Sequence, residues 1–352
     1  MKKNILSNDN SANEQFERQV ITGSEKGKKL YSFNSQHDKT TPAQFWFQES
    51  NQGLVLFVVF YTLACRWSQC LSCNLPSKMS PHHIDFKAIM AQVDHIFNTA
   101  EIMKKSDAIK KVIISNNGSV LDEATFSSSA LMYLMARLNH HLPNMSVLSI
   151  ETRPEFVDLE ELEFLDRSLK EGETPTELEL CIGFEAFDDR IRNDYFNKGL
   201  PLETFEALVK KIAPYKYGLK CYFMQKPVPG ITDKLAIEDI QRAIDYLSAI
   251  QKEYGIRINM HLNPTFVAKG TILEDEFRKG NYSPPDLLDV AAAARHARDK
   301  NISVFIGLFD EGLAVTGGSF IKKGDEEIIA RLEEFNRSGN FNILDNLCKP
   351  IT

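Results

Sequence analysis

The chain has 352 residues, of which 43% are hydrophobic and 25% charged, and its formal net charge is -7. This composition is typical of a globular protein with one large or two medium domains. The apolar run at residues 53–65 is too short to span a bilayer. The negative net charge excludes a global basic field for nucleic acid, although a local basic patch stays open.

The N-terminal region is polar and rich in Asn, Ser and Lys. Its first 19 residues contain two lysines but no apolar core of a secretory signal, so we expect a cytoplasmic protein. In a reducing compartment, clustered cysteines are more often metal ligands or redox groups than disulfides. Residues 1 to about 40 show little periodicity, which predicts a mobile arm or a loosely packed lead-in. We therefore divide the chain into an N-terminal arm (1–49), a core domain (50–310) and a C-terminal extension (311–352).

After Gly53, short apolar runs alternate with helical patterns. The runs predict strands at residues 54–62, 111–117, 146–152, 178–186, 219–225, 257–263 and 302–309. Amphipathic or proline-initiated patterns predict helices at residues 83–100, 233–250 and 283–300. Residues 324–340 predict one amphipathic helix followed by coil.

The predicted strands are β-branched and apolar on both faces, as parallel strands covered by helices are. Alternation of strand and helix predicts an α/β fold with a parallel sheet. Six or seven such units suit a full or partial barrel, here a partial (βα)6 TIM-like barrel. A doubly wound open sheet is the alternative, although no G-x-G-x-x-G motif follows a strand to support dinucleotide binding.

Three of the six cysteines lie directly after the first predicted strand, at Cys65, Cys70 and Cys73 with the spacing C-x4-C-x2-C. A structural zinc site needs four ligands, so a zinc hypothesis requires His82 or His83 as the fourth. Three thiolates alone leave one iron of an iron–sulfur cluster open for a ligand. We favour the cluster over zinc, because polar residues follow the neighbouring strands.

Polar side chains stand at nearly every predicted strand end, where active sites of parallel α/β folds form. Each has an ordinary structural explanation, such as a turn, a rim salt bridge or a surface lysine, but their convergence favours an enzyme. In chain order they are Asn116, Asn117, Gly118, Ser119, Glu151, Arg153, Glu185, Lys226 and Asn263.

With this strand, the three-cysteine loop resembles the radical S-adenosylmethionine (SAM) superfamily. The usual spacing there is C-x3-C-x2-C, so this loop has one extra residue, and Ser72 stands where an aromatic residue is usual. The segments "IISNNGSVLDE", "SIETRPEFV" and "LELCIGFEAFDDRIRNDYFNKGL" are similar to the elongator-like and archaeosine-forming branches. The segments "GLKCYFMQKPVPGITDKLAIEDI" and "NPTFVAKGT" resemble the archaeosine-forming enzyme, so the likeness covers about residues 50–300.

The resemblance implies a [4Fe-4S] cluster on Cys65, Cys70 and Cys73 that chelates SAM and cleaves it reductively to a 5′-deoxyadenosyl radical. A one-electron donor such as flavodoxin or ferredoxin is then expected as a partner, and neither DNA nor a membrane is. Candidate SAM contacts are Asn117, Gly118, Ser119, Glu151, Arg153 and Glu185. Candidate catalytic or substrate residues are Lys198, Lys226 and Asn263.

Three functions stay open from the sequence. The nearest relatives in the branch suggest modification of a base in tRNA. A small metabolite or peptide is the second candidate substrate, mildly favoured by the net charge of -7 because tRNA affinity depends on phosphate neutralisation. The third is a zinc-stabilised binding protein without enzymatic activity.

Overall fold

The computed structural model describes residues 6–348, so the outermost parts of the predicted arm and extension, residues 1–5 and 349–352, lie outside the described residues. Two compact units make up the chain. Unit 1 comprises Met1–Gln48 and Leu54–Leu178, and unit 2 comprises Glu49–Gly53 and Glu179–Thr352. The predicted core domain, residues 50–310, contributes to both units.

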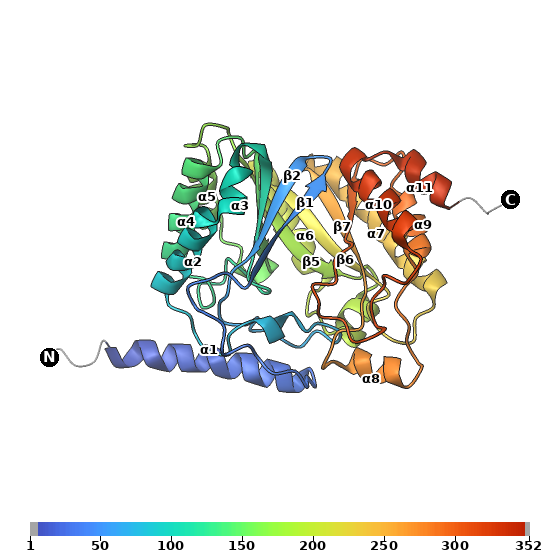
Figure 1. The fold of residues 1–352 in the computed structure, drawn as a ribbon, viewed down its shortest axis with the longest axis horizontal. Coiled ribbons are helices and arrows are strands. Elements are labelled where there is room, and N and C mark those ends of the chain that lie inside the picture. The colour runs from blue at the N-terminus through green and yellow to red at the C-terminus, as the bar shows by residue number, and fades with distance from the viewer. Residues whose placement is uncertain (1–5, 349–352) are drawn as a thin grey trace. The chain divides into compact units, whose positions relative to one another are not determined.

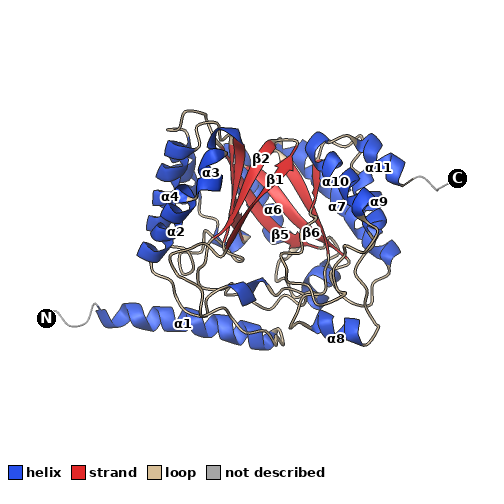
Figure 2. Ribbon diagram, viewed as in Figure 1, coloured by secondary structure: helices blue, strands red, loops and turns tan. Residues whose placement is uncertain are grey.

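Unit 1 is built on strands that lie in chain order and, from β2 to β4, run parallel. Helices cover these strands (Figures 1 and 2). Asp85 caps α2 by accepting hydrogen bonds from the N–H groups of Lys87 and Ala88, and Ile89 and Val93 are fully buried beneath it. The elements are α1 (Leu6–Lys26), β1 (Gln44–Ser50), β2 (Gly53–Val59), η1 (Leu75–Lys78), α2 (Phe86–Asn98), α3 (Ala100–Lys104), η2 (Ser106–Ala108), β3 (Ile109–Ser115), α4 (Ser128–His141), β4 (Val147–Thr152), η3 (Pro154–Phe156) and α5 (Leu159–Leu169).

Unit 2 repeats the pattern with strands β5 to β8 in chain order, each parallel to the next. Helix α7 begins after Thr232, whose side chain accepts from the N–H of Leu235, and ends at Gly255 in the left-handed region. The elements are β5 (Glu177–Glu185), η4 (Arg190–Tyr195), α6 (Leu202–Ile212), η5 (Ala213–Tyr215), β6 (Gly218–Gln225), α7 (Asp233–Tyr254), β7 (Ile258–Pro264), α8 (Ile272–Arg278), α9 (Leu287–Arg295), β8 (Ser303–Ile306), α10 (Glu326–Ser338) and α11 (Phe341–Leu347).

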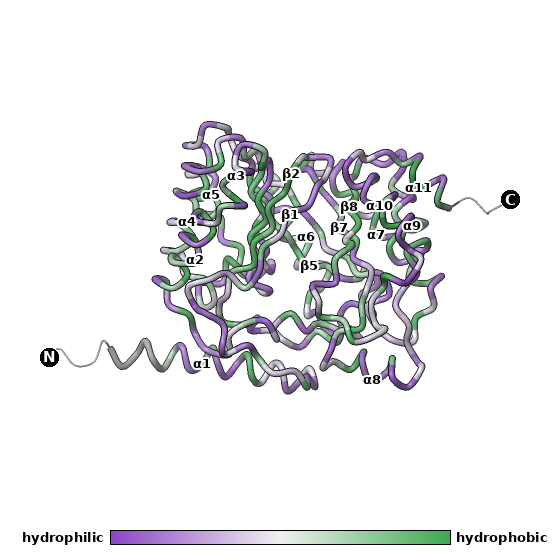
Figure 3. Tube along the Cα trace, viewed as in Figure 1, coloured by the Kyte–Doolittle hydropathy of each residue, from purple (hydrophilic) through white to green (hydrophobic). Residues whose placement is uncertain are grey.

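The predicted fold class is confirmed: this is an α/β fold of the partial-barrel type. All seven predicted strands are present, and Figure 3 shows them as mainly hydrophobic. A doubly wound sheet reverses its strand order at a switch point, whereas within each unit here the order follows the chain. Within residues 6–348, none of the helices has the length and apolar character needed to cross a membrane.

Two local expectations were wrong. Residues 6–26, expected to be a mobile or loosely packed lead-in, form the 21-residue helix α1, and Val20 on it is fully buried. Residues 341–347, expected to be coil, form α11, which buries Leu344. The buried face of α1 contains few large apolar residues, and α11, with seven residues, is too short to show a helical period.

Candidate functional site: the cysteine loop and the strand ends around it

The cysteine loop begins where β2 ends. Beyond β2 the chain stays extended, and the N–H of Ala64 donates to the carbonyl of Ser80 at 2.8 Å. The loop then carries Cys65, Cys70 and Cys73, and a turn joins the last two, because the N–H of Cys73 donates to the carbonyl of Cys70 at 3.2 Å. The three thiols are therefore on one loop at the carboxyl end of a parallel strand, as the sequence predicts.

The longer gap between the first two cysteines is held by its side chains. Arg66 makes a bidentate ion pair with Asp122, at 2.6 and 2.8 Å. The indole of Trp67 lies under the Arg153 guanidinium, 5.0 Å from its Cζ to the ring centre. Ser68 takes a left-handed φ of 46° and donates through Oγ to the carbonyl of Cys65. The extra residue is thus accommodated by a tight turn at the buried Ser68.

Lys29, which follows α1, binds the second half of the loop. Its Nζ donates to the carbonyls of Cys70, of Leu71 at 3.0 Å and of Cys73 at 2.9 Å. Burial, aided by the neighbouring Cys70, raises the pKa of the Cys73 thiol to about 12. A buried thiol ionises readily when a metal replaces its proton, so binding of a metal and loss of this proton would go together.

The loop after β3 lies against Cys65. A Cβ placed on Gly118 would come within 3.2 Å of both Cα and Cβ of Cys65, so only glycine allows this approach without a shift. Asn117 takes a left-handed φ of 55°. Asn116 is fully buried and donates through Nδ2 to Ser119 and Thr125, while its Oδ1 has no hydrogen-bond partner among the described residues.

The end of β4 adds a carboxylate and a guanidinium to the same edge. Glu151 accepts a hydrogen bond from the Ser115 hydroxyl at the end of β3. Arg153 is largely buried, which by itself lowers its pKa, but its ion pair with Glu155 and the nearby Cys65 hold that pKa above the usual value. Arg153 is therefore a fixed positive charge beside the cysteine loop.

In unit 2, Glu185 ends β5 with a left-handed φ of 71° and pairs with Lys198 at 2.7 Å. Gly183 makes room for this pair, because a Cβ there would meet Glu185 Oε1 at 2.4 Å and Lys198 Nζ at 2.5 Å. Lys226, at the end of β6, pairs with Asp233 at 2.6 Å, so its ammonium is held at the start of α7.

Asn263 is partly exposed on β7, in register with Met224 of β6. Gly307 lies against it, because a Cβ at Gly307 would come within 2.3 Å of its Oδ1. The absence of a side chain at Gly307 therefore leaves the space that the Asn263 amide occupies.

The donor set of the loop fits an iron–sulfur cluster. Three thiols on one loop, with Lys29 and Arg153 as compensating positive charges, suit a cluster held by thiolates. Among residues 6–348, no three Cys, His, Asp or Glu side chains are grouped around one ion; in a cluster each thiolate binds a different iron. The histidines of the zinc hypothesis contact Glu17 instead, through the His82 ring at 3.2 Å and the His83 N–H at 2.9 Å.

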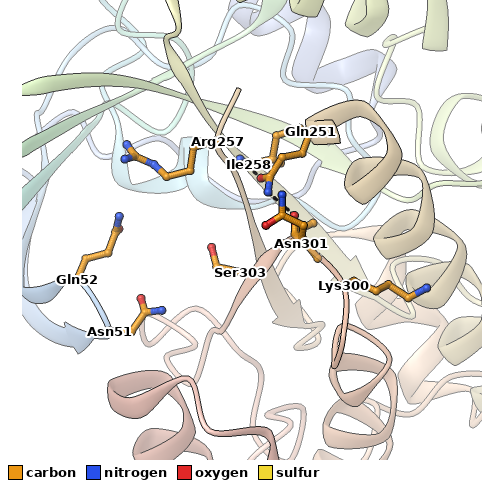
Figure 4. A pocket seen from close by; sticks show the side chains of 9 residues that line it. Asn51, Gln52, Gln251, Arg257, Ile258, Lys300, Asn301 and Ser303 are labelled. Carbon is orange, nitrogen blue, oxygen red and sulfur yellow. Dashed lines mark hydrogen bonds between the residues drawn. The ribbon is translucent and has the colours of Figure 1, made fainter. Parts of the chain in front are cut away.

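A separate cavity of about 380 Å³ lies in unit 2 (Figure 4). It is at the amino ends of β7 and β8, next to the turn that contains Asn51 and Gln52, and is therefore remote from the carboxyl strand ends. Lys300 at its edge is paired with Asp245, and Gln251 accepts from the N–H of Ile258. None of the predicted site residues lines this cavity.

Comparison with known proteins identifies the family. No family model matches the chain. An uncharacterized protein of Methanocaldococcus jannaschii is 28% identical over 330 residues, which are 89% of this chain and 85% of that protein. The archaeosine synthase subunit beta of Methanosarcina acetivorans is 30% identical over 250 residues, which are 70% of this chain and 68% of that protein. The chain belongs to the archaeosine synthase subunit beta family.

The predicted branch is thereby confirmed, and so is the prediction of an enzyme. The solved archaeal Elp3 of Methanocaldococcus infernus is a distant structural neighbour, with a TM-score of 0.45 and 15% identity over 65% of this chain. The match spans 54% of the solved Elp3 chain, which lacks its N-terminal residues 1–46. The likeness is too weak to add to the family assignment.

In this member of the archaeosine synthase subunit beta family, the predicted residues fall in both units. Unit 1 gathers Cys65, Cys70, Cys73, Asn117, Gly118, Ser119, Glu151 and Arg153 at adjacent strand ends. Unit 2 contains Glu185, Lys198, Lys226 and Asn263. Sequence reasoning missed Lys29 and the pair of Arg66 with Asp122. Arg66 lies within the cysteine motif, but its partner Asp122 is 56 residues away, and nothing in the sequence points to Lys29.

Proposed function

We propose that this chain is a radical SAM enzyme that holds a [4Fe-4S] cluster on Cys65, Cys70 and Cys73 and acts on a modified base in tRNA. One observation carries the proposal: the three-cysteine loop at the end of β2 lies against the glycine-containing loop at the end of β3. The name of the relative, archaeosine synthase subunit beta, supports the base as substrate.

The residues around the loop suit SAM. When bound, a cluster of this kind supplies the single electron that cleaves SAM and starts hydrogen abstraction from the substrate. Arg153 is a fixed cation for the methionyl carboxylate, and Glu151 is an acceptor for ribose hydroxyls. The loop of Asn117, Gly118 and Ser119 provides polar groups for the methionyl amine, and Glu185 is a further acceptor.

On the substrate side we propose Lys198, Lys226 and Asn263. Lys198 and Lys226 already have carboxylate partners, Glu185 and Asp233. Their ammonium groups therefore reach a substrate only if it displaces or shares these carboxylates. Asn263 offers both a donor and an acceptor at a partly exposed strand end.

Anaerobic reconstitution with iron and sulfide tests the proposal. The protein is expected to bind about four irons, as a [4Fe-4S] cluster requires, and to release 5′-deoxyadenosine from SAM after reduction by dithionite, flavodoxin or ferredoxin. Cys65→Ala, Cys70→Ala and Cys73→Ala are expected to abolish both, while Cys348→Ala serves as the matched control. Bound zinc, with no iron after reconstitution, would contradict the proposal.

A small metabolite or peptide remains the second candidate substrate because the net charge is -7. A gel-shift assay with tRNA at increasing salt separates the two. A tRNA substrate requires binding that weakens steeply with salt, as phosphate contacts do. Absence of binding at low salt would favour the small substrate. We place the activity in the cytoplasm.

A further inference from the structure

The end of helix α1 packs directly onto the backbone of the cysteine loop. Gly23 and Gly27, one turn apart, make this possible: a Cβ on Gly23 would lie 2.4 Å from the Trp67 carbonyl oxygen, and one on Gly27 would lie 3.0 Å from that of Ser68. Arg66 of the loop also donates to the Gln19 side chain at 3.0 Å. The helix and the loop therefore meet backbone to backbone, with little freedom to slide.

Lys29 follows this contact and completes it. An ammonium group has three N–H donors, and three loop carbonyls accept from it, those of Cys70, Leu71 and Cys73. These carbonyls belong to the turn that carries the second and third cysteines. A single side chain thus fixes the spacing of two proposed cluster ligands and places a positive charge beside them.

Building on the proposed function, we propose that Lys29 is a positioning residue for the iron–sulfur cluster: it fixes the turn of residues 70–73 and raises the cluster's reduction potential. Reduction by one electron adds one negative charge next to the Lys29 ammonium. A nearby cation stabilises the more negative state, and its effect is larger in a buried site than in water. Loss of this charge therefore disfavours reduction.

The test compares four variants after anaerobic reconstitution. Lys29→Met removes the charge and the donors, Lys29→Gln keeps a donor without charge, and Lys29→Arg keeps both. Lys26→Met removes an exposed charge from the last turn of α1 and is the matched control. Iron content, the reduction potential from an electron paramagnetic resonance titration with dithionite, and the rate of iron loss to a chelator are measured.

Lys29→Met and Lys29→Gln are expected to make reduction at least tenfold less favourable, a shift of about 59 mV to more negative potential for one electron. Lys29→Met is expected to lose iron several-fold faster than the wild type. Lys29→Arg is expected to restore most of both properties, and Lys26→Met is expected to match the wild type. If Lys29→Met fails to fold, Lys29→Gln and Lys29→Arg decide the question.

Potentials and iron-loss rates that are the same in the wild type, Lys29→Gln and Lys29→Met would overturn the inference. An equal shift of the reduction potential in Lys26→Met would also overturn the inference, because the loss of any positive charge from this part of the protein would then explain the shift. Failure of the proposed function is distinguishable from either result, since the wild-type protein would then take up no iron before any variant is compared.

Discussion

Gly118 approaches Cys65 so closely that no room is left for a side chain between the loop after β3 and the first cysteine. A Cβ at residue 118 would sit 3.2 Å from both Cα and Cβ of Cys65, tighter than ordinary packing. This contact joins the proposed cluster ligand to the proposed SAM-binding loop. A larger side chain here must push the two apart.

We therefore predict that Gly118→Val lowers SAM affinity at least tenfold, measured by equilibrium dialysis on the reconstituted protein. Gly118→Ala is expected to have a smaller effect, because a shift of the neighbouring atoms by a few tenths of an ångström makes room for one methyl group. The far-UV circular dichroism spectrum of both variants is expected to match the wild type. Wild-type affinity in Gly118→Val would show that the loop and the cysteine move independently.

The ion pair of Glu185 and Lys198 gives a second prediction. Each side chain is 14% exposed, so removing one partner leaves a largely buried charge. Lys198→Met is expected to lower the free energy of unfolding by about 3 kcal/mol, measured by urea denaturation. The double variant Glu185→Gln with Lys198→Met is expected to recover part of this loss, because no buried charge is left unpaired.

The control for this prediction is the pair of Lys234 and Glu238 on α7, where the lysine side chain is 85% exposed and the charges are 3.8 Å apart. Lys234→Met is expected to change the free energy of unfolding by no more than about 0.5 kcal/mol. If both lysine variants lose the same amount, burial is not what gives the Glu185 pair its strength.

The strands and the cysteine loop could be predicted from the sequence, because the patterns that indicate them involve residues close together in the chain. The apolar run before Cys65 and the spacing of the three cysteines are visible in a single stretch of the chain. Strand ends in parallel folds converge, so Asn117, Glu151 and Arg153 followed from the strand assignments. Their individual roles do not follow, because each depends on which groups surround it.

The contacts of α1 and the ion pair of Arg66 could not be predicted from the sequence, because they join residues far apart in the chain. Lys29 binds carbonyls 41 to 44 residues away, and backbone carbonyls carry no sequence signal. The packed face of α1 contains Val20, Gly23 and Ser24 rather than a stripe of large apolar residues, so no helical periodicity marked it. The pair of Arg66 with Asp122 spans 56 residues and needed the fold to become visible.

Glu17 of α1 gives a pH-dependent prediction. Partial burial raises the pKa of this carboxyl, but hydrogen bonds from the His83 N–H and the His82 ring outweigh it, so the net pKa lies below the usual 4.5. Folding then favours the carboxylate. The stabilisation is present above the unfolded-state pKa of 4.5 and is lost as the pH falls through the lower folded-state pKa.

The difference in unfolding free energy between the wild type and Glu17→Gln is therefore expected to be largest above pH 4.5 and to shrink at lower pH. Because the carboxyl is partly exposed, we expect less than about 1 kcal/mol. Urea denaturation at a series of pH values measures it, and Glu14→Gln, at an exposed position on the same helix, is the control. A difference that grows on acidification would contradict the assignment.

At Gly23, helix propensity and packing predict opposite changes in stability when the glycine is replaced by alanine. In a helix, alanine is more favourable than glycine by about 0.8–1.0 kcal/mol, so propensity alone predicts that Gly23→Ala stabilises the protein. The new Cβ, however, would lie 2.4 Å from the Trp67 carbonyl oxygen, which is backbone and cannot rotate away. We expect the packing effect to be the larger one, so that Gly23→Ala lowers the melting temperature and makes α1 more accessible to limited proteolysis.

Thr22→Ala, at an exposed neighbouring position, is the matched control. It is expected to leave the melting temperature and the protease resistance of α1 unchanged or slightly higher. A higher melting temperature for Gly23→Ala would mean that α1 does not rest on the cysteine loop in solution, and the positioning role of Lys29 would lose its structural basis with it.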